Sequence, residues 1–497
     1  MIVGLDVGTS VTKAAAFDAD GAAIAVEARP TQLLHPGPGR VEQDLEEVVA
    51  SVLDVLRALA ARLDAPPAAI GVTGQGDGLW LLDERGAAAR PALSWMDGRA
   101  GATVTEWIGD GTFDALYRRT GNAPFPGAGA PLLIALERDE PASLDRAATA
   151  ARCKDAVMQR LTGVRATDVS DASNLFTDVA ARRRDAELLA LCGLAHRADL
   201  LPPVAGEDPT GAAPDGPRPL PQGELIAALA DATGLPAGLP VTAGPYDLPA
   251  CAAGAGIERV GDGLLIAGTT LACEVVVDRV ELRGEPAGQT LCLAEPGRWL
   301  RAMPAMTGTA ALDWALRLVG ASHEQLSGLL ATSPPGAHGV RVLPLLSSAG
   351  ERAPFVAPDA RGRLDGVQLD TTAADVVRAF CEGLACAARH CFEAAGLTGE
   401  VAVGGGGSAS REWLQVFADV IGRPLRLARG PEVGARGAAL AAARQLGIAV
   451  DPAVWTRSDD WIEPDPASTA AYDERYARYV QDVADARARW TSPRAAS

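Results

Sequence analysis

A single acidic residue stands among small and apolar residues near the middle of the chain. Asp247 lies in the segment GPYDLPACAAGAG, residues 244–256. A carboxylate that takes a proton from a hydroxyl group must be fixed in place and partly shielded from water. The neighbouring glycines would let the backbone and a ligand approach closely. Asp247 is therefore the candidate catalytic base. The alternative is an ordinary helix N-cap, with Pro249 in the first turn.

The beginning of the chain predicts a β-hairpin whose first bend could hold phosphate. A buried strand is expected over residues 2–7 (IVGLDV), and the bend GTSVTK and a second strand follow it. Glycine, threonine and serine in a bend present N–H and hydroxyl groups together, which suits phosphate oxygens. Thr9, Ser10 and Lys13 lie in this bend, and Asp6 before it could hold a hydrated Mg²⁺. The alternative is a plain hairpin turn.

A similar hairpin is expected in the second half of the chain. Residues 263–277 (GLLIAGTTLACEVVV) again give a strand, a Gly-Thr bend and a strand. Gly268, Thr269 and Thr270 take the place of the Gly-Thr-Ser of the first bend. Such a repeat predicts two similar domains that hold one phosphate chain between them. Gly308 opens a predicted helix, and helix N-termini favour anions.

A polar loop follows the predicted buried strand at residues 69–73. This loop is GQGDG, residues 74–78. In open α/β sheets, ligands lie beyond the carboxyl ends of the strands. Gln75 and Asp77, with Gly76 between them, would offer an amide and a carboxylate to the hydroxyl groups of a ligand. The alternative is a polar turn.

The segment SWMDGRA, residues 94–100, adds an aromatic side chain to these candidates. Trp95 could flank a small polar ligand. Asp97 and Arg99, two residues apart, are expected to form an ion pair with each other.

Four consecutive glycines lie between a predicted strand and a predicted helix in VAVGGGGSASREW, residues 401–413. Glycines such as Gly405 and Gly406 permit the close approach of a flat ring or a phosphate. The alternative is a flexible strand-to-helix turn. A second helix, rich in glycine and alanine, is expected over residues 432–446.

Composition limits the class of protein. The chain has 497 residues, which is too long for one core and predicts two or more domains. Its net charge of −18 argues against nucleic acids and acidic membrane surfaces as partners. No apolar run reaches the ~18 residues of a membrane span. The N-terminal MIVGLDVG lacks a basic region, so no signal peptide is expected.

Cysteines and lysines are also informative. The eight cysteines form no CxxC pair, which predicts buried free thiols in a reducing cytoplasm rather than a zinc site. The chain has 45 basic residues, of which only Lys13 and Lys154 are lysines. Either lysine could be functional, or could remain by chance in a chain rich in arginine.

The remaining elements are predicted from periodicity and turn residues. Asp44 is expected to open a helix, and residues 241–244 are expected to form a strand that leads to Asp247. The other expectations are helices over 131–200 with a loop at 161–173, a linker at 202–222, a long ordered loop at 350–366, a helix at 375–392, and a packing stripe of Tyr472, Tyr476 and Tyr479.

Taken together and in this order, the motifs resemble the FGGY carbohydrate kinases of the actin, hexokinase and heat-shock chaperone superfamily. The resemblance runs from residue 2 to about residue 480. It implies an α/β fold with two actin-like, ribonuclease-H-like domains, which close over ATP and a sugar or polyol. The expected domains are residues 1–243, with the first phosphate motif and the acceptor loop, and residues 244–497, with the base and the other two motifs.

The resemblance also implies roles for single residues. Asp247 matches the general base and, with Asp6, a Mg²⁺ ligand. Thr269 would lie near the transferred phosphoryl group, and Ser410 near the nucleotide. The implied substrate-binding residues are Gln75, Gly76, Asp77, Trp95 and Asp247; the implied ATP-binding residues are Thr9, Ser10, Lys13, Gly268, Thr269, Thr270, Gly308, Gly405, Gly406 and Ser410.

The acceptor is a small polyol or ketose in this interpretation. The segments TGQGDGLWLLD, residues 73–83, and GRVEQD, residues 39–44, are similar to the erythritol kinase branch, whose other relatives phosphorylate L-xylulose or related keto acids. Xylulokinases and glycerol kinases usually carry a His or an Arg-Glu pair where Gly76 and Asp77 stand here. This difference disfavours D-xylulose and glycerol without excluding them.

A second class of function stays open. A nucleotide-driven regulatory or chaperone-like binding protein of the same superfamily would keep both phosphate hairpins but need no acceptor pocket. Gln75, Asp77 and Asp247 together favour the kinase. The expected partners are ATP, Mg²⁺ and a small polyol or sugar, without nucleic acid or membrane, in the cytoplasm, and the resemblance allows a homodimer.

Overall fold

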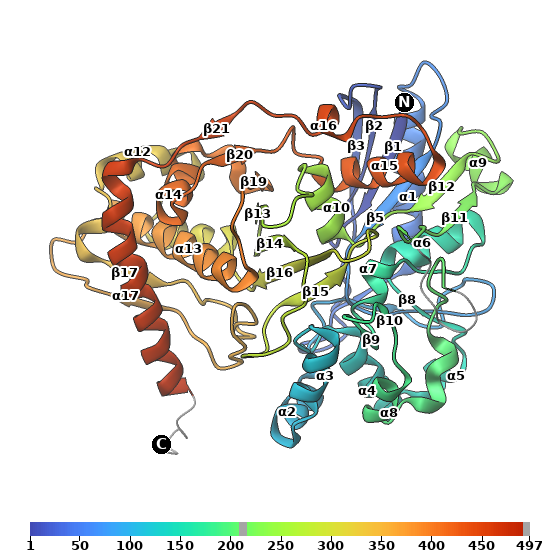
Figure 1. Ribbon diagram of the computed structural model, residues 1–497, viewed down its shortest axis with the longest axis horizontal. Coiled ribbons are helices and arrows are strands. Elements are labelled where there is room, and N and C mark those ends of the chain that lie inside the picture. The colour runs from blue at the N-terminus through green and yellow to red at the C-terminus, as the bar shows by residue number, and fades with distance from the viewer. Residues whose placement is uncertain (208–215, 491–497) are drawn as a thin grey trace.

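The computed structural model describes residues 1–207 and 216–490. Two halves, each built on one large mixed sheet, lie side by side, with helix α10 (Asp247–Gly254) between them (Figure 1). Part of the predicted linker at residues 202–222 lies outside the described residues. The described part of the linker includes the beginning of strand β11.

The N-terminal sheet has six strands in the order β11-β12-β5-β1-β2-β3. The first three strands of the chain form antiparallel pairs, whereas β5 runs parallel to β1, and β12 runs parallel to β5. The bounds are β1 Ile2–Val7, β2 Val11–Phe17, β3 Ala23–Pro30, β5 Ile70–Gly74, β11 Gln222–Glu224 and β12 Pro240–Ala243.

The C-terminal sheet has seven strands in the order β15-β16-β14-β13-β19-β20-β21. Here β13 and β14 are antiparallel, and β19 runs parallel to β13. The bounds are β13 Gly263–Ala267, β14 Leu271–Val277, β15 Gln289–Cys292, β16 Trp299–Ala305, β19 Val401–Gly404, β20 Leu425–Leu427 and β21 Trp461–Ile462.

The two sheets repeat one arrangement, as the two similar hairpins predict. A strand pairs antiparallel with its successor and parallel with a later strand: β1 with β2 and β5, and β13 with β14 and β19. In both halves a glycine-containing bend joins the first two strands. This repeated topology is the two-domain actin-like arrangement that the resemblance implies.

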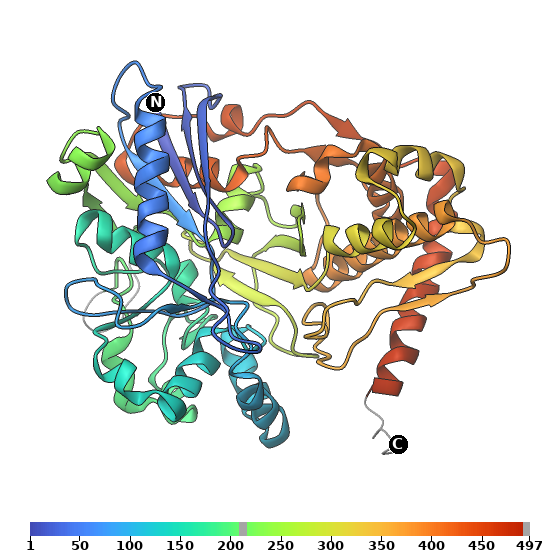
Figure 2. The ribbon, with the colours of Figure 1, turned by 180° about the vertical axis from the view of Figure 1, so that it is seen from behind.

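Helices cover both faces of the N-terminal sheet. Helix α1 (Leu45–Ala60) begins at its predicted N-cap, Asp44, whose side chain accepts a hydrogen bond from the N–H of Glu46 at 2.8 Å. Helix α1 lies beside β2 and β3 (Figure 2). Its apolar side chains recur at helical spacing and are buried. The opposite face carries α15 (Val433–Leu446), which comes from the C-terminal part of the chain.

The region 131–200 differs from the prediction, because it is not only helical. It contains the short strands β8 (Thr149–Ala151), β9 (Thr177–Asp178) and β10 (Arg183–Arg184), and α7 (Val169–Ala172) lies in the predicted loop at 161–173. Its other elements, with their neighbours, are α2 Gly101–Asp110, α3 Thr112–Thr120, α4 Gly129–Asp139, α5 Pro141–Asp145, α6 Cys153–Thr162, α8 Ala186–Leu191, the 3₁₀ helix Ala195–Leu200 and α9 Ala227–Thr233.

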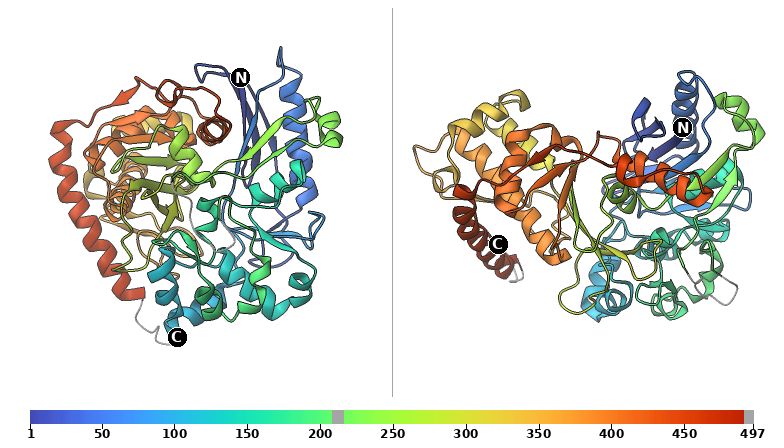
Figure 3. Two further views of the ribbon diagram at one scale, coloured as in Figure 1. Left: turned by 45° about the vertical axis from the view of Figure 1, so that its right-hand side comes forward. Right: turned by 45° about the horizontal axis from the view of Figure 1, so that its top comes forward.

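The C-terminal half carries the longest helices. Helix α17 (Pro466–Trp490) lies on the outer side of this half, far from the N-terminal sheet (Figure 3), and its three tyrosines are buried as predicted. The others are α11 Thr309–Leu318, α12 Leu326–Thr332, α13 Ala373–Ala395, α14 Arg411–Ile421 and α16 Pro452–Trp455. Short paired strands are β4 Glu42–Gln43 with β7 Ala92–Leu93, β6 Trp80–Leu82 with β8, and β17 Arg341–Leu343 with β18 Arg363–Asp365. Within the described ranges, no helix is long and apolar enough to span a membrane.

Backbone packs directly against backbone where α15 crosses α10 and the N-terminal sheet. A Cβ atom on Gly4 of β1 would lie 1.8 Å from the carbonyl oxygen of Ala435, and one on Gly437 would lie 1.8 Å from that of Ala250. Gly71 on β5 is equally confined by α15. Glycine is required here because no side chain fits between the elements. The crossing fixes the distance between β1 and α10, and so between Asp6 and Asp247.

We predict that Gly437→Ala destabilises the protein. The added methyl group must displace the backbone of α10, and overpacking of this kind costs about 1–3 kcal/mol. Gly109→Ala in α2 is the matched control, because Gly109 is an exposed helical glycine with nothing near its missing Cβ. We expect this control to gain about 0.5–1 kcal/mol. Urea unfolding of both variants measures the difference, and equal midpoints would contradict the packing argument.

Candidate active site

Asp247 is the first residue of α10, and the N-cap is Tyr246, so the alternative interpretation of Asp247 as the N-cap is wrong. The carboxylate of Asp247 is half-buried, and its Oδ1 atom is enclosed without a hydrogen-bond partner in the described structure. Burial raises the pKa of Asp247 well above its usual value, and repulsion from Asp6, Asp171 and Asp77 raises it further. The Oδ1 atom is therefore free to accept a proton or a cation.

Two side chains hold the segment that precedes α10. The Tyr246 N–H donates to Ser170 Oγ at 2.9 Å, and the Thr73 hydroxyl donates to the carbonyl of Pro245 at 2.7 Å. Ser170 Oγ in turn donates to Asp168 Oδ2 at 2.6 Å. Since Asp247 follows Tyr246 directly, these bonds fix where the candidate base begins.

A buried ion cluster lies behind Ser170. Lys154 Nζ is 2.6 Å from Asp155, 2.9 Å from Asp168 and 2.9 Å from Asp171, and all four side chains are buried. Burial disfavours the charged ammonium group, but the three carboxylates outweigh this and hold the pKa of Lys154 well above its usual value. Lys154 therefore anchors the scaffold beneath the candidate base.

The acceptor loop is held in a conformation that few residues adopt. Asp77 has a φ of 52°, in the left-handed region. Its Oδ2 atom accepts hydrogen bonds from the Tyr246 hydroxyl at 3.1 Å and from Gln289 Nε2 at 2.8 Å. A Cβ atom on Gly76 would overlap the Tyr246 ring, so glycine is required there. Such strained, over-determined positions cluster at functional sites.

Thr9, Gln75 and Trp95 form one hydrogen-bonded chain. Trp95 Nε1 donates to Thr9 Oγ1 at 2.9 Å, and Thr9 Oγ1 donates to Gln75 Oε1 at 2.9 Å. Gln75 Nε2 donates to Gln43 Oε1 at 2.6 Å. The chain joins the first hairpin (β1–β2) to the acceptor loop, so two motifs predicted separately meet at one site.

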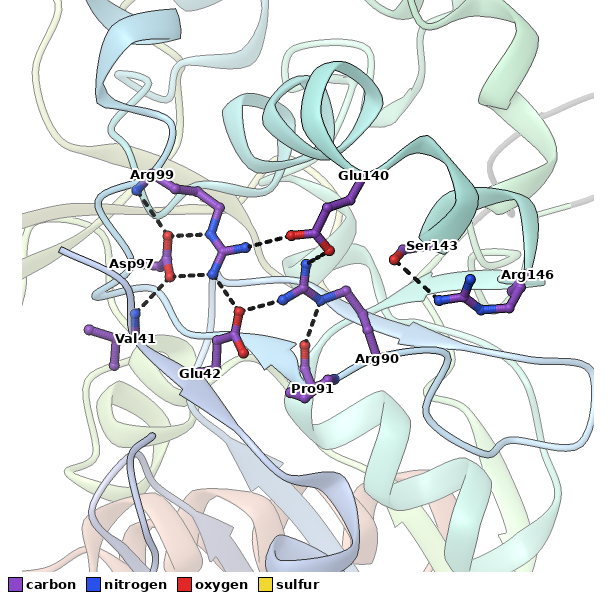
Figure 4. Close-up of polar contacts among 9 residues, drawn as sticks. All are labelled: Val41, Glu42, Arg90, Pro91, Asp97, Arg99, Glu140, Ser143 and Arg146. Atoms are coloured by element: carbon purple, nitrogen blue, oxygen red, sulfur yellow. Dashed lines mark hydrogen bonds and ion pairs between the residues drawn. The ribbon is translucent and has the colours of Figure 1, made fainter. Parts of the chain in front are cut away.

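A buried network of charges supports this chain from behind (Figure 4). Arg99 Nε pairs with Asp97 at 2.8 Å, which confirms the predicted pair. Both Arg99 and Arg90 also contact Glu42, the residue before Gln43, and Arg90 Nη1 contacts Glu140 at 2.6 Å. The network fixes the strand that carries Gln43 against the segment that carries Trp95.

Asp6 and Lys13 lie opposite each other on β1 and β2. Burial raises the pKa of Asp6 to about 6; Lys13 opposes this rise, and Glu432 adds to it. A Cβ atom on Gly434 would lie 2.5 Å from Asp6 Oδ2, so the start of α15 lies against this carboxylate. Asp6 and Asp247 repel each other, which makes their shared surroundings favourable to a cation.

The second hairpin (β13–β14) is in contact with two other predicted nucleotide motifs. The Gly308 N–H donates to the carbonyl of Thr269 at 2.9 Å, and the next residue, Thr309, donates to that of Gly268 at 2.7 Å. The Gly308 site has no room for a side chain against Gly268 and Thr270. These short contacts bring the start of α11 to the bend of the hairpin.

The glycine loop begins beside the same hairpin. Gly405 has a φ of 91°, and a Cβ atom there would lie 2.7 Å from the carbonyl oxygen of Ala267 at the end of β13. Gly406 faces open space, with nothing within 4 Å of its missing Cβ. Ser410 Oγ accepts a hydrogen bond from the Trp413 N–H at 3.3 Å and so caps α14.

Sequence reasoning missed several residues at the site. Arg352 lies over the rings of Trp95 and Phe125, at 5.4 Å and 4.6 Å from their centroids, and its Nε donates to the carbonyl of Pro304 at 2.8 Å. The feature of the sequence that could have indicated Arg352 is an arginine in the long polar loop that contains GERAPF. Tyr246 beside the base and Gln43 in GRVEQD were also in segments already singled out.

Family comparisons cover nearly the whole chain. Residues 1–254 match the N-terminal domain of the FGGY family of carbohydrate kinases, and residues 277–446 match its C-terminal domain. The chain therefore belongs to the FGGY family of carbohydrate kinases, as its motifs predict. It is a phosphotransferase with an alcohol group as acceptor.

The chain is also similar to individual carbohydrate kinases. The chain is 32% identical to an erythritol kinase of Brucella abortus, over 96% of this chain and 95% of that protein. It is also 32% identical to a xylulose kinase of Klebsiella pneumoniae, with 90% of each chain covered. The crystal structure of a xylulose kinase from Rhodospirillum rubrum has a TM-score of 0.86 and 31% identity, with 99% of each chain covered.

We predict that Ser170→Ala destabilises the protein and reduces activity. The buried Tyr246 N–H would lose its partner, which costs about 1–3 kcal/mol. Thr332→Ala is the control, because that exposed hydroxyl only donates to the carbonyl of Gly328 in its own helix. We expect its free energy of unfolding to change by less than about 0.5 kcal/mol. Equal losses of unfolding free energy in the two variants would show that Ser170 does not hold the segment at Tyr246.

We predict that the free energy of unfolding falls as the pH rises and Asp6 loses its proton. The pKa of Asp6 is about 6 in the folded protein, against 3.8 unfolded, so the folded state binds this proton more tightly. That advantage is complete below about pH 4 and is lost as the pH rises to about 6. With a chelator and without nucleotide, Asp6→Asn should gain stability over the wild type across this range, by up to about 3 kcal/mol. A pH-independent difference would contradict the assignment.

Proposed function

We propose that this protein transfers the γ-phosphoryl group of ATP to a terminal hydroxyl of a small polyol or ketose. The observation that carries the proposal is the unpartnered Oδ1 atom of Asp247, which lies next to the acceptor loop and near Asp6 of the first hairpin. Relatives named erythritol kinase and xylulose kinase support this class of acceptor. Within the class, glycerol is the less favoured acceptor.

The nucleotide lies between the two hairpins in this proposal. Thr9, Ser10 and Lys13 on one side, and the Gly268–Thr270 bend on the other, bind the phosphates. Gly308 and Gly405 keep the backbone close to that second bend, and the contacts described above support this role. The open space at Gly406 suits the flat adenosine, with Ser410 at the start of the next helix.

The acceptor lies along the loop that contains Gln75, Gly76 and Asp77, with Trp95 beside it. Gln75 and Asp77 orient the hydroxyl groups, because both are held by partners on other elements. Holding the reacting atoms in place supplies most of the catalysis in phosphoryl transfer.

The chemistry of the carboxylates fits Mg²⁺, which takes oxygen ligands and keeps several waters. Asp6, through water, and Asp247 would hold it, since repulsion from Asp6 raises the pKa of Asp247 and Asp247 Oδ1 has no partner. The described residues hold no group of three acidic, histidine or cysteine side chains that could bind a metal alone. Phosphate oxygens and water would complete the shell. When bound, Mg²⁺ neutralises charge on the phosphates.

In the reaction, Asp247 Oδ1 takes the proton from the acceptor hydroxyl. The hydroxyl oxygen then forms a bond to the γ-phosphorus while the bond from that phosphorus to the β-γ bridging oxygen breaks, which leaves ADP. The aspartic acid later gives its proton to solvent. Closure of the two domains excludes water and suppresses hydrolysis of ATP.

The proposal also concerns the setting of the enzyme. All eight cysteines are free, which supports a reducing compartment such as the cytoplasm. The net charge of −18 supports small-molecule partners rather than nucleic acids. We propose a domain boundary at residues 243–244, after which α15 returns to pack on the N-terminal sheet.

The test is formation of ADP and of phosphorylated product with a panel of tetritols, pentitols, ketoses and glycerol. Asp247→Asn should lower kcat by about a thousandfold or more while ATP still binds, because the isosteric amide cannot take the proton. Asp247→Glu is the control, because it keeps a carboxylate at this position. ATP turnover that no acceptor changes, or full activity in Asp247→Asn, would reject the proposal and favour a regulatory binding protein.

A further inference from the structure

A small cavity lies beside the acceptor loop, and most of the residues that line it are not among the site residues described above. Its volume is about 40 Å³, and its lining includes Asp77, Phe125, Phe176 and Gln289. A space of this size holds two or three waters or one hydroxymethyl group. The cavity is therefore large enough for the end of a small acceptor but not for a second sugar unit.

One lining residue has no partner of its own. The amide of Asn174 is enclosed at both Nδ2 and Oδ1, and neither atom makes a hydrogen bond within the described structure. A buried amide without partners costs free energy, so such a group calls for a ligand or water. Asn174 is also held near the acceptor loop, because Arg152 donates to the carbonyl of Gly78 at 2.6 Å and to that of Asn174 at 3.4 Å.

A second asparagine in the same lining provides the contrast. Asn122 donates to the carbonyls of Thr120 at 2.9 Å and Ser173 at 2.8 Å, and its Oδ1 accepts from the Thr290 N–H at 2.8 Å. Its amide is used in joining the two halves, where edge strand β15 reaches α7 (Figure 1). Asn122 is thus structural, whereas the Asn174 amide is unused by the fold.

The charge of the lining limits what can enter. Asp77 is the one ionisable residue among those that line the cavity, all of which are described, and none of the thirteen is basic. A carboxylate placed there would face a carboxylate, and like charges in contact cost several kcal/mol in binding. Hydroxyl groups, in contrast, can donate to Asp77 and exchange hydrogen bonds with the Asn174 amide.

We propose that this cavity binds the end of the acceptor farthest from the phosphorylated hydroxyl, and that it selects an uncharged hydroxymethyl end over a carboxylate. This rests on the proposed function, with the reacting hydroxyl at Asp247 and Asp77 between the two ends. Asn174 is then a specificity-determining residue, and the enzyme acts on neutral polyols and ketoses rather than on sugar acids.

The test compares matched acceptors that differ only at one end: erythritol with erythronate, and xylitol with xylonate. For the wild type we expect kcat/KM to be at least a hundredfold higher for each polyol than for its acid. A ratio below about threefold would overturn the proposal. So would turnover of an acid that disappears in Arg352→Met, because the carboxylate would then bind at Arg352.

Two variants separate recognition from folding. Asn174→Ala should raise KM for the best neutral acceptor about tenfold, with little change in kcat or in Tm, because its amide makes no bond within the fold. Asn122→Ala should lower Tm. An unchanged KM in Asn174→Ala, or a fall in its Tm like that of Asn122→Ala, would overturn the proposal.

Calorimetric binding of the acceptors without ATP keeps this test independent of catalysis. If the wild type binds a polyol at least tenfold more tightly than Asn174→Ala does, the subsite stands even in a preparation that does not transfer phosphate, and only the proposed function fails. If both proteins bind every polyol equally, or bind none, the subsite is rejected whatever the kinase activity.

Discussion

The site depends on the direct contact of backbone with backbone where α15 crosses α10 and the N-terminal sheet. Gly4 and Gly71 on the sheet, and Gly437 on α15, leave no room for a side chain. Because the elements touch without side chains between them, their spacing cannot vary much. The start of α15 therefore rests against Asp6, and α10 presents Asp247 to the same space. Packing thus brings the two carboxylates together. It does not offset the repulsion between them.

Buried clusters of charged side chains hold the elements around these carboxylates in place. Behind Asp247, Lys154 binds three buried aspartates, and one of these, Asp168, holds the serine that fixes Tyr246. Behind the acceptor loop, the network of Arg90 and Arg99 holds the strand of Gln43. In both clusters every charged side chain contacts one of opposite charge, whereas Asp247 Oδ1 and the Asn174 amide have no partner in the described structure. Charges that contact opposite charges thus form the support, and Asp247 and Asn174 lie at the positions proposed for ligands.

The sequence allowed the prediction of features that depend on neighbouring residues. The two hairpins, the glycine loop, the Asp97–Arg99 pair and the family itself follow from short motifs, and all are confirmed. The roles of the single site residues stay predictions. What could not be predicted depends on distant segments: Gln289 reaches Asp77 from the other half, and α15 returns to the N-terminal sheet. The place of Asp247 at the first helical position, after Tyr246, depends on Ser170 and Thr73, which lie far away in the chain.

The burial of Lys154 has a consequence for chemical labelling. The chain has only two lysines, and Lys154 is enclosed by three carboxylates and shielded from solvent. A reagent that acylates primary amines therefore meets a single reachable ε-amino group, that of half-buried Lys13 on β2, opposite Asp6. In most proteins such reagents modify many surface lysines at once. Here a side chain is acylated at one position only, Lys13 in the first hairpin. The yield of this product therefore reports whether that hairpin is accessible to the reagent.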